Sequence, residues 1–304
     1  MLKERKFVLA REALDSLKPS IETSSKEVQY HFRHSLGILL INEGKSEEGL
    51  YSLVLADDLE AQGFDKEPIL SYNLAISLSR LGKYAASAGV LERAYREFSQ
   101  DKMDVTSMMV DSNLGLNYLR LGHFELAKMF FEKSLARANY LNHTRYIGNT
   151  LHNLGCLYLK TRKHDKAIEY FNKASGCFKR GSDSYLEVLY FKSLCYIELK
   201  NTMREASVSR GRSLSKDNDH YSLLFESLSH LMYTKKDESL DYIENQTIPY
   251  LLGKHQYFKL FDYYLALENA YAKKGTKDGK IQSLEIKAKA FDIHKIMTSG
   301  REFL

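Results

Sequence analysis

Three asparagines recur at one position of a repeated pattern, 40 residues apart, as Asn73, Asn113 and Asn153. Each is followed by leucine and then by alanine or glycine. An asparagine side chain both donates and accepts hydrogen bonds, so it can bond to the main chain of an extended peptide. A fixed period of this length indicates stacked supersecondary units, in which equivalent residues lie side by side. The pattern therefore predicts a row of amides along one wall of the protein.

The bulk composition indicates a large apolar core and little excess charge. The 304 residues are 44% hydrophobic, and 44 basic against 39 acidic side chains give a net charge of +5. That excess is too small to indicate nucleic-acid binding by itself. Only three prolines occur, which leaves room for long uninterrupted helices. The length suits two average domains or one extended array of repeats.

Several features that are missing from the sequence bear on where the protein is located and on whether it binds a metal. No apolar run reaches the roughly 18 residues of a transmembrane helix, and the N-terminus is too charged for a secretory signal. Cys156, Cys177 and Cys195 have no CxxC spacing, which argues against a disulfide framework and a zinc site. We therefore expect a cytoplasmic protein that binds no membrane, no metal and no other cofactor.

Enzyme motifs are missing from the sequence as well. The chain contains no GxSxG, no HExxH and no P-loop. His31 and His34 lie one turn apart on an expected helix, but no carboxylate or cysteine stands at metal-ligand spacing from them. We expect that the protein is not an enzyme.

The repeat is clearest around Gly115. Tyr118 lies three residues after it, Gly122 seven, Ala127 twelve and Phe131 sixteen. The pattern resembles the tetratricopeptide repeat, a helix–turn–helix unit in which small residues let two helices pack closely. The period of 38 to 40 residues exceeds the usual 34, which predicts helices about one turn longer. Other copies follow the same frame, with their small residues at Gly37, Ala75 and Gly155.

The whole chain, residues 1–304, is interpreted as one tetratricopeptide-repeat regulatory domain. We expect an all-α, right-handed superhelical solenoid of about seven helix pairs, with positive φ at glycines in the helix turns. One more helix or pair precedes the repeats and ends at Pro19. The weaker C-terminal copies are expected as a first helix from Leu189 with a degenerate partner near Glu205, a helix over 223–233, its partner over 239–252 interrupted by Pro249, and a last pair over 257–274 and 280–297.

In a solenoid of helix pairs, the first helix of each pair lines the concave side. Amides, rings and charges along such a wall suit a short extended peptide. A single asparagine there can instead bond to a neighbouring helix or to water, but three in register favour a peptide groove. The predicted peptide-binding residues are Tyr72, Asn73, Arg80, Asn113, Asn117, Asn149, His152, Asn153, Glu187, Tyr190 and Asn269, with Asp262 and Tyr263 on the same wall.

Beyond the generic repeat, four stretches resemble the peptide-pheromone receptors of Gram-positive bacteria, the group of the Rap, NprR and PlcR proteins. The stretches are residues 145–158, 166–174, 186–191 and 257–296. The resemblance implies a cytoplasmic quorum-sensing receptor for a short imported signalling peptide, whose backbone Asn153 would grip, with Asn149 as a second contact. It also implies a switch in compactness or oligomeric state, as a dimer or tetramer, that regulates transcription or sporulation.

The N-terminus departs from part of this group. NprR and PlcR carry an N-terminal helix-turn-helix domain, whereas residues 1–60 here have the pattern of repeat helices. DNA would thus be bound only through a helix-turn-helix that this chain lacks, and the chain is most similar to an NprR-type regulator without it. Two alternatives stay open: a Rap-like regulator that binds a sporulation response regulator, and a plain protein–protein scaffold. The expected oligomer interface is the aromatic tail with Phe258, Phe261, Tyr264 and Phe291.

Overall fold

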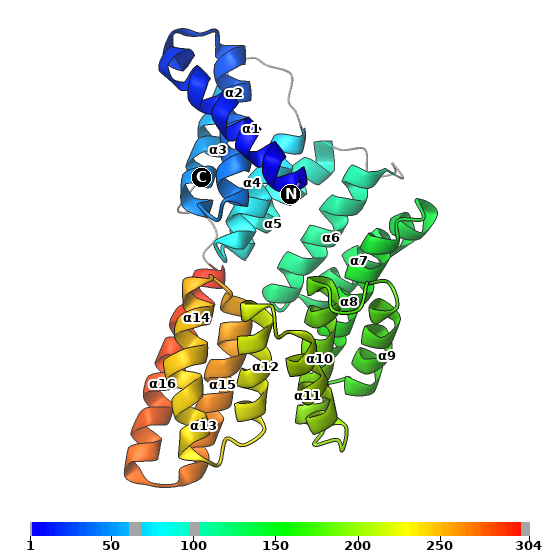
Figure 1. Cartoon of the computed structure of the whole chain (residues 1–304), viewed down its shortest axis with the longest axis vertical. Helices are drawn as coiled ribbons and strands as arrows, with labels where there is room; N and C mark the ends of the chain where they lie inside the picture. Colours follow the sequence, from blue (N-terminus) through cyan, green and yellow to red (C-terminus); the bar gives the residue numbers. More distant parts are fainter. Residues whose placement is uncertain (1, 61–67, 98–103, 299–304) are drawn as a thin grey trace. The chain divides into compact units, whose positions relative to one another are not determined.

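The protein is all-helical, as the repeat predicts. The computed structural model describes residues 2–60, 68–97 and 104–298, and every regular element in these ranges is a helix. The chain divides into two compact units, Met1–Lys102 with Thr298–Leu304, and Met103–Met297. We call them unit 1 and unit 2 (Figure 1).

Unit 1 contains two helix pairs preceded by an N-terminal helix. Helix α2 packs on α3, α3 on α4, and α4 on α5. Gly44 and Gly82, in the turns inside the two pairs, have φ of 85° and 77°, which confirms the predicted positive φ. The helices are α1 (Leu2–Leu17), a 3-10 helix (Lys18–Thr23), α2 (Lys26–Asn42), α3 (Ser46–Glu60), α4 (Pro68–Arg80) and α5 (Tyr84–Glu97).

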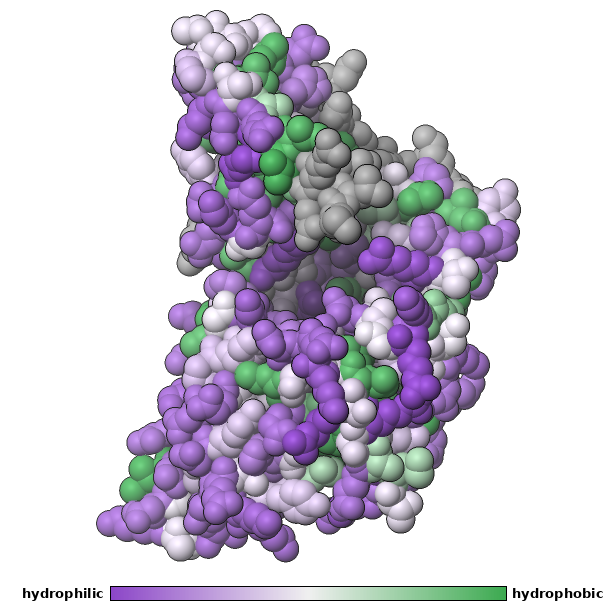
Figure 2. Space-filling model, viewed as in Figure 1, coloured by the Kyte–Doolittle hydropathy of each residue, from purple (hydrophilic) through white to green (hydrophobic). Residues whose placement is uncertain are grey.

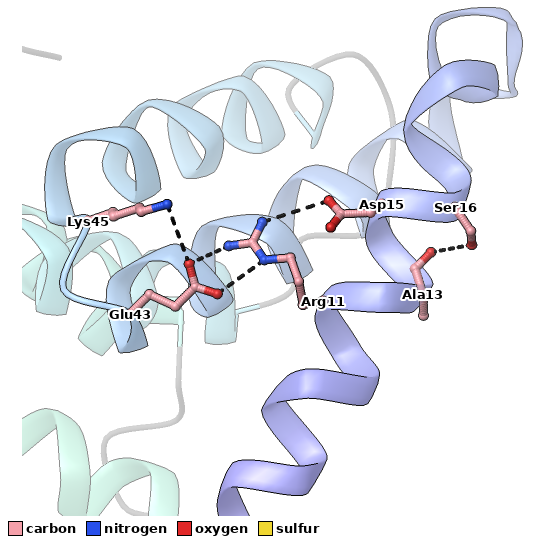
Figure 3. A network of polar contacts seen from close by, with 6 residues as sticks. All are labelled: Arg11, Ala13, Asp15, Ser16, Glu43 and Lys45. Carbon is pink, nitrogen blue, oxygen red and sulfur yellow. Dashed lines mark hydrogen bonds and ion pairs between the residues drawn. The ribbon is translucent and has the colours of Figure 1, made fainter.

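The N-terminal helix α1 is fixed on α2 by apolar and ionic contacts. Leu14 of α1 lies in a buried cluster with Phe32 and Leu39 of α2. At the end of α2, Arg11 Nε donates a hydrogen bond of 3.1 Å to Glu43 Oε1, and Arg11 Nη2 pairs with Glu43 Oε2 (Figure 3). A two-point contact between a guanidinium and a carboxylate sets orientation as well as distance. The extra N-terminal helix expected from the sequence is therefore packed on the first repeat.

Unit 2 contains the other helix pairs, and they stack. Helix α6 packs on α7, α8 on α9 and α10 on α11, while each second helix also contacts the first helix of the next pair. The first helices α6, α8, α10 and α12 touch in that order, so they form one continuous layer, as in a solenoid. The bounds are α6 (Val105–Arg120), α7 (Phe124–Tyr140), α8 (Thr144–Lys160), α9 (His164–Ser175), α10 (Asp183–Glu198), α11 (Arg204–Leu214) and α12 (Asp219–Leu231).

Glycines in the first helices set the distance between the helices of a pair. A Cβ atom on Gly155 would lie 2.5 Å from Phe171 Cε1, and one on Gly115 would lie 2.6 Å from Phe131 Cδ1. Both phenylalanine rings are fully buried. A larger residue at either glycine therefore requires the ring to move. The small and large positions of the repeat frame meet as the sequence predicts.

The first helix of the sixth pair begins earlier than expected. Helix α12 starts at Asp219 rather than at Leu223, because Asn218 caps it. The Asn218 side chain accepts a hydrogen bond of 3.2 Å from the Tyr221 backbone N–H. Such a cap satisfies one of the N–H groups that the first turn of a helix leaves without a partner.

The partner of α12 is interrupted, as Pro249 predicts. It consists of α13 (Asp237–Tyr242), a π-helical turn (Ile243–Thr247) and α14 (Ile248–Gly253). Proline has no backbone N–H and cannot continue a regular ladder of helix hydrogen bonds, and the wider π turn stands directly before it. The last pair, α15 (Tyr257–Lys274) and α16 (Lys277–Thr298), is joined at Gly275, with φ of 69°.

The described surface is mostly polar. The face of unit 2 in Figure 2 is largely hydrophilic, with small separate hydrophobic patches. Of the tail aromatics expected at an interface, Tyr264 is buried while Phe291 is 68% exposed. Among the described residues, no helix combines the length and the apolar character that a membrane span requires.

The Gly155–Phe171 contact gives a stability prediction. Gly155→Ala should lower the free energy of unfolding by about 1–3 kcal/mol, because the new methyl group forces the buried ring out of its position. Urea unfolding followed by circular dichroism measures it. The control is Gly89→Ala on α5, where a Cβ atom would meet nothing within 4 Å. There we expect a gain of about 0.5–1 kcal/mol from helix propensity alone. Equal effects of the two substitutions would contradict the packing role of Gly155.

Candidate functional site

The row of asparagines lies on the first helices, but its members differ in their hydrogen bonds. In unit 1, Asn73 Nδ2 lies 2.9 Å from His34 Nε2 on the neighbouring first helix. In unit 2, Asn113 Nδ2 donates to the Met109 carbonyl of its own helix at 2.9 Å. Asn153 is half-buried, and its amide makes no hydrogen bond to another described residue. The amide of Asn153 is thus the one of the three that is available to a ligand.

A cavity of about 280 Å³ lies between α8 and the N-terminal ends of α10 and α12. Asn149, one turn before Asn153 on α8, lines it and likewise makes no hydrogen bond among the described residues. Its lining comes from α8, α10, α12 and the turn before α10. The seven lining residues are Asn149, His152, Phe178, Asp183, Ser184, Glu187 and Tyr221.

His152 is held in this lining as a neutral ring. Its ring contacts those of Phe171 and Phe191, with centroid distances of 5.6 and 5.3 Å, and these two rings also contact each other. Burial lowers the pKa of His152 from 6.5 to about 4, against the opposing charge of Glu187. Its Nε2 lies 3.5 Å from Cys156 Sγ, whereas the buried Nδ1 has no hydrogen-bond partner among the described residues.

Two carboxylates line the cavity, and of these Asp183 is exposed while Glu187 is half-buried. Glu187 Oε1 accepts a hydrogen bond of 2.8 Å from Lys259 Nζ on α15, 72 residues further along the chain. Burial acts to raise the pKa of Glu187, but the Lys259 ammonium and the neighbouring histidines outweigh it and the pKa is lowered. Glu187 is therefore ionised at neutral pH. Its Oε2 is buried and has no hydrogen bond of regular geometry among the described residues, while the Tyr221 hydroxyl interacts with the Glu187 carboxylate. Burial and this carboxylate raise the pKa of Tyr221.

A second cavity, of about 600 Å³, lies toward the C-terminal ends of α8, α10 and α12. Helix α15 forms part of its wall, and Tyr190 and Asn269 line it. Tyr190 is buried and its hydroxyl donates to the Tyr263 hydroxyl at 3.2 Å. Lys160 of α8 pairs with Asp262 of α15. Helix α15 thus contacts α8 and α10 on the side of these helices where both cavities lie.

Five of the eleven residues predicted for the groove line the two cavities of unit 2. Asn149, His152 and Glu187 share the smaller cavity, and Tyr190 and Asn269 share the larger one. Asn117 is 1% exposed, which places it inside the helix packing. Asn269 is exposed and its Nδ2 donates to the Leu265 carbonyl of its own helix at 2.8 Å.

Three predicted residues belong to unit 1. Asn73 bonds to His34, as described above, and Tyr72 is half-buried on α4. Arg80 Nη1 donates to the Ile41 carbonyl at 2.6 Å, and burial lowers the pKa of Arg80. The Arg80 and Asn73 side chains thus connect the first helices of unit 1.

Five residues at the smaller cavity were missed from the sequence. Phe178, Asp183, Ser184 and Tyr221 line it, and Lys259 holds the carboxylate of Glu187. The capping residues Ser182 and Asn218 mark where α10 and α12 begin, and this signal would have placed Asp183 and Tyr221 in their first turns. Lys259 has no such signal, because its partner Glu187 is distant in the sequence.

The neutral state of His152 gives a prediction of pH dependence. Because the pKa of His152 is lower in the folded chain, the unfolded chain binds more protons between pH 6.5 and about 4. The stability contributed by the neutral ring is present above pH 6.5 and is lost on acidification to pH 4, by about 3 kcal/mol. Urea unfolding across this range should show a shallower decline for His152→Gln. Parallel profiles of the two proteins would refute the assignment.

The comparisons with known proteins agree with this architecture. The sequence model of the tetratricopeptide repeat matches residues 106–180. No curated protein matches the amino-acid sequence significantly.

Solved structures match nearly the whole chain. The apo form of the quorum sensor NprR from B. thuringiensis aligns with a TM-score of 0.75 and 19% identity, over 96% of this chain and 84% of that one. NprR in complex with its cognate peptide NprX gives 0.71 and 19% over the same shares. A Rap protein complexed with competence and sporulation factor gives 0.76 and 13%, over 94% of this chain and 80% of that one. Residues 106–180 therefore match the tetratricopeptide repeat, and the fold of the chain matches those of the NprR and Rap quorum-sensing receptors over nearly its whole length.

Proposed function

We propose that the chain is the regulatory part of a receptor for a short signalling peptide, of the NprR type. The peptide lies along the inner wall of the first helices in unit 2. Its binding changes the oligomeric state of the receptor, as a dimer or tetramer, and thereby the activity of a transcriptional regulator. DNA contact in such a regulator belongs to a helix-turn-helix domain, not to the repeats described above.

The amide of Asn153 is the observation that supports this proposal most. It stands at the in-register position of the repeat, half-buried, with no hydrogen bond to a described residue. Asn149 lies one turn earlier on the same face of α8 and is equally available. Two such amides can each donate to a carbonyl and accept from an N–H of an extended peptide.

The spacing of the two cavities supports the same ligand. Asn149 lines the smaller cavity and Lys160 lines the larger one, both on α8. Eleven residues of helix separate them, or about 16 Å at 1.5 Å per residue. An extended peptide covers that distance with about five residues at 3.3 Å each. A short peptide can therefore place a side chain in each cavity while Asn153, between them, holds its backbone.

The solved relatives support the class of ligand. NprR was crystallised with its cognate peptide NprX, and a Rap protein with competence and sporulation factor. Their folds resemble this chain equally well, with TM-scores of 0.71 and 0.76. A Rap-like regulator of a sporulation response regulator is thus the second candidate. Loss of phosphate from a phosphorylated response regulator on mixing with this chain would favour it over the NprR type.

The test of the proposal is calorimetric titration with synthetic peptides, starting from the C-terminal seven residues of small reading frames beside the gene. We expect micromolar or tighter binding and a change in mass by light scattering. Asn153→Ala should weaken binding by about 1–3 kcal/mol or abolish it, because it removes a main-chain contact.

The matched control is Asn113→Ala, which removes an amide that is already bonded to its own helix. It should bind like the parent chain. Equal affinity of Asn153→Ala and the parent would remove Asn153 from the site. Failure of the parent chain to bind any of these peptides would favour a scaffold for a protein partner.

A further inference from the structure

Two cations without a carboxylate partner meet where α9, α10 and α11 pack together in unit 2. Lys192 of α10 is half-buried, and its Nζ donates a hydrogen bond of 2.7 Å to Asn172 Oδ1 of α9. Arg210 of α11 is exposed, and its Nη2 donates a hydrogen bond of 2.8 Å to the Tyr185 hydroxyl of α10. Both acceptors are neutral groups. Among the described residues, no carboxylate forms an ion pair with either cation.

The positions of these two cations are unfavourable for both of them. Burial lowers the pKa of Lys192, and the neighbouring charge of Arg210 lowers it further. An ammonium has three N–H donors and a guanidinium has five, so both groups keep donors for an incoming anion. The carboxylates nearest to them along the chain have other partners, with Glu187 paired to Lys259, Glu198 to His164 and Glu205 to Arg204.

The segment around the two cations contains the positive charge of the chain. Residues 162–216, from the turn before α9 to the turn after α11, include 12 basic and 6 acidic side chains. This excess of six is larger than the net charge of +5 of the whole chain, so the rest of the chain is nearly neutral. A negatively charged partner is therefore attracted to this part of unit 2.

Exposed apolar side chains adjoin the cations. Leu199, directly after α10, is 41% exposed, and Met203, directly before α11, is 53% exposed. Leu199 lies seven residues after Lys192, and Met203 lies seven residues before Arg210. Seven residues are two helix turns, so each apolar side chain stands on the same face as its cation, about 10 Å along the helix. We call these four residues the α10–α11 patch, which has a cationic end and an apolar end.

The α10–α11 patch is separate from the two cavities. Helices α9 and α11 are the second helices of their pairs, so they lie away from the inner wall. On α10, Lys192 is two residues from Tyr190 and from Leu194, which line the larger cavity. Two residues turn a helix by about 200°, so Lys192 points away from that cavity. A partner can therefore occupy the patch while a peptide occupies the inner wall.

We propose that the α10–α11 patch docks an acidic segment of a protein partner that also carries a large apolar side chain. Carboxylates of the segment pair with Lys192 and Arg210, and its apolar side chain covers Leu199 and Met203. The distance between the two ends corresponds to about three residues of an extended segment or seven of a helix. A nucleic acid matches less well, because it offers phosphates for one end and no aliphatic side chain for the other. The sequence pI of about 8.8 is also below the value of about 9 that is typical of nucleic-acid-binding domains.

The experiment is selection of peptides of about 15 residues, long enough for both spacings, from a random display library on the whole chain. Counter-selection on the Lys192→Gln/Arg210→Gln double variant removes peptides that bind elsewhere, and calorimetry then measures the recovered peptides. We expect sequences that combine aspartate or glutamate with a large apolar residue at one of the two spacings. Arg210→Gln should weaken their binding about 10- to 100-fold, because it removes a charged donor. Met203→Gln should weaken it about 3- to 10-fold, because it removes an apolar contact.

Two variants on α7, another second helix of unit 2, are matched controls. Lys128→Gln removes one positive charge, and Met129→Gln replaces a methionine that is 39% exposed. Both should bind the recovered peptides like the parent chain. Asn153→Ala, on the inner wall, should do the same, because the inference does not depend on a signalling peptide.

Four results would overturn the inference, and none of them bears on the proposed peptide receptor. One is the recovery of no peptide that prefers the parent chain to the double variant. Equal losses in Arg210→Gln and Lys128→Gln would indicate attraction by net charge alone. Loss of binding in Asn153→Ala would place the recovered peptides on the inner wall. Tighter binding of a short DNA duplex, weakened by Arg210→Gln but not by Met203→Gln, would indicate a nucleic acid as the partner.

Discussion

The close approach of a glycine to a phenylalanine ring within a helix pair is the constraint on which the rest of unit 2 depends. At Gly155 the ring of Phe171 occupies the space that a side chain would take, and Gly115 and Phe131 repeat the arrangement. Dense packing at this contact fixes the distance between the two helices. Since the core of each pair is filled there, the opposite face of the first helix needs no apolar residues. Amides and carboxylates can therefore stand on the inner wall.

The repeat places equivalent residues at the same position of successive first helices but does not decide what each of them bonds to. Asn73, Asn113 and Asn153 were predicted as one row, and they do lie on successive first helices. One amide bonds to His34, one to its own helix, and one is available. These differences depend on side-chain rotamers and on neighbours from other copies, which a periodic pattern does not contain. The sequence thus predicts that these asparagines lie on first helices, but not which of their amides lacks a hydrogen bond within the described residues.

Prediction of helix bounds from the sequence is less accurate in the C-terminal copies, where the residues of the repeat are less regular. The first three copies carry glycine at the turn inside the helix pair, and the fourth carries Arg162. All four residues have positive φ, so the turns lie where the repeat frame places them. Helix α12 was started four residues late, so Tyr221 was left outside the site, although the Asn218 cap marked the true start. The pairing of Glu187 with Lys259 depends on α15 reaching α10. No local pattern encodes a contact between residues 72 positions apart.

The electrostatics of the inner wall follow from the same architecture. A carboxylate in a half-buried position stays ionised only if a cation lies near it, and Lys259 fulfils that condition for one oxygen of Glu187. His152 stays neutral because it is buried against two aromatic rings, and burial disfavours the charged imidazolium. Both side chains keep one buried polar atom without a hydrogen bond of regular geometry among the described residues. A fold selected for stability alone would satisfy or replace these atoms, since each costs free energy. Their retention on the wall of the smaller cavity agrees with the proposed peptide site, because a ligand bound there would complete the missing hydrogen bonds.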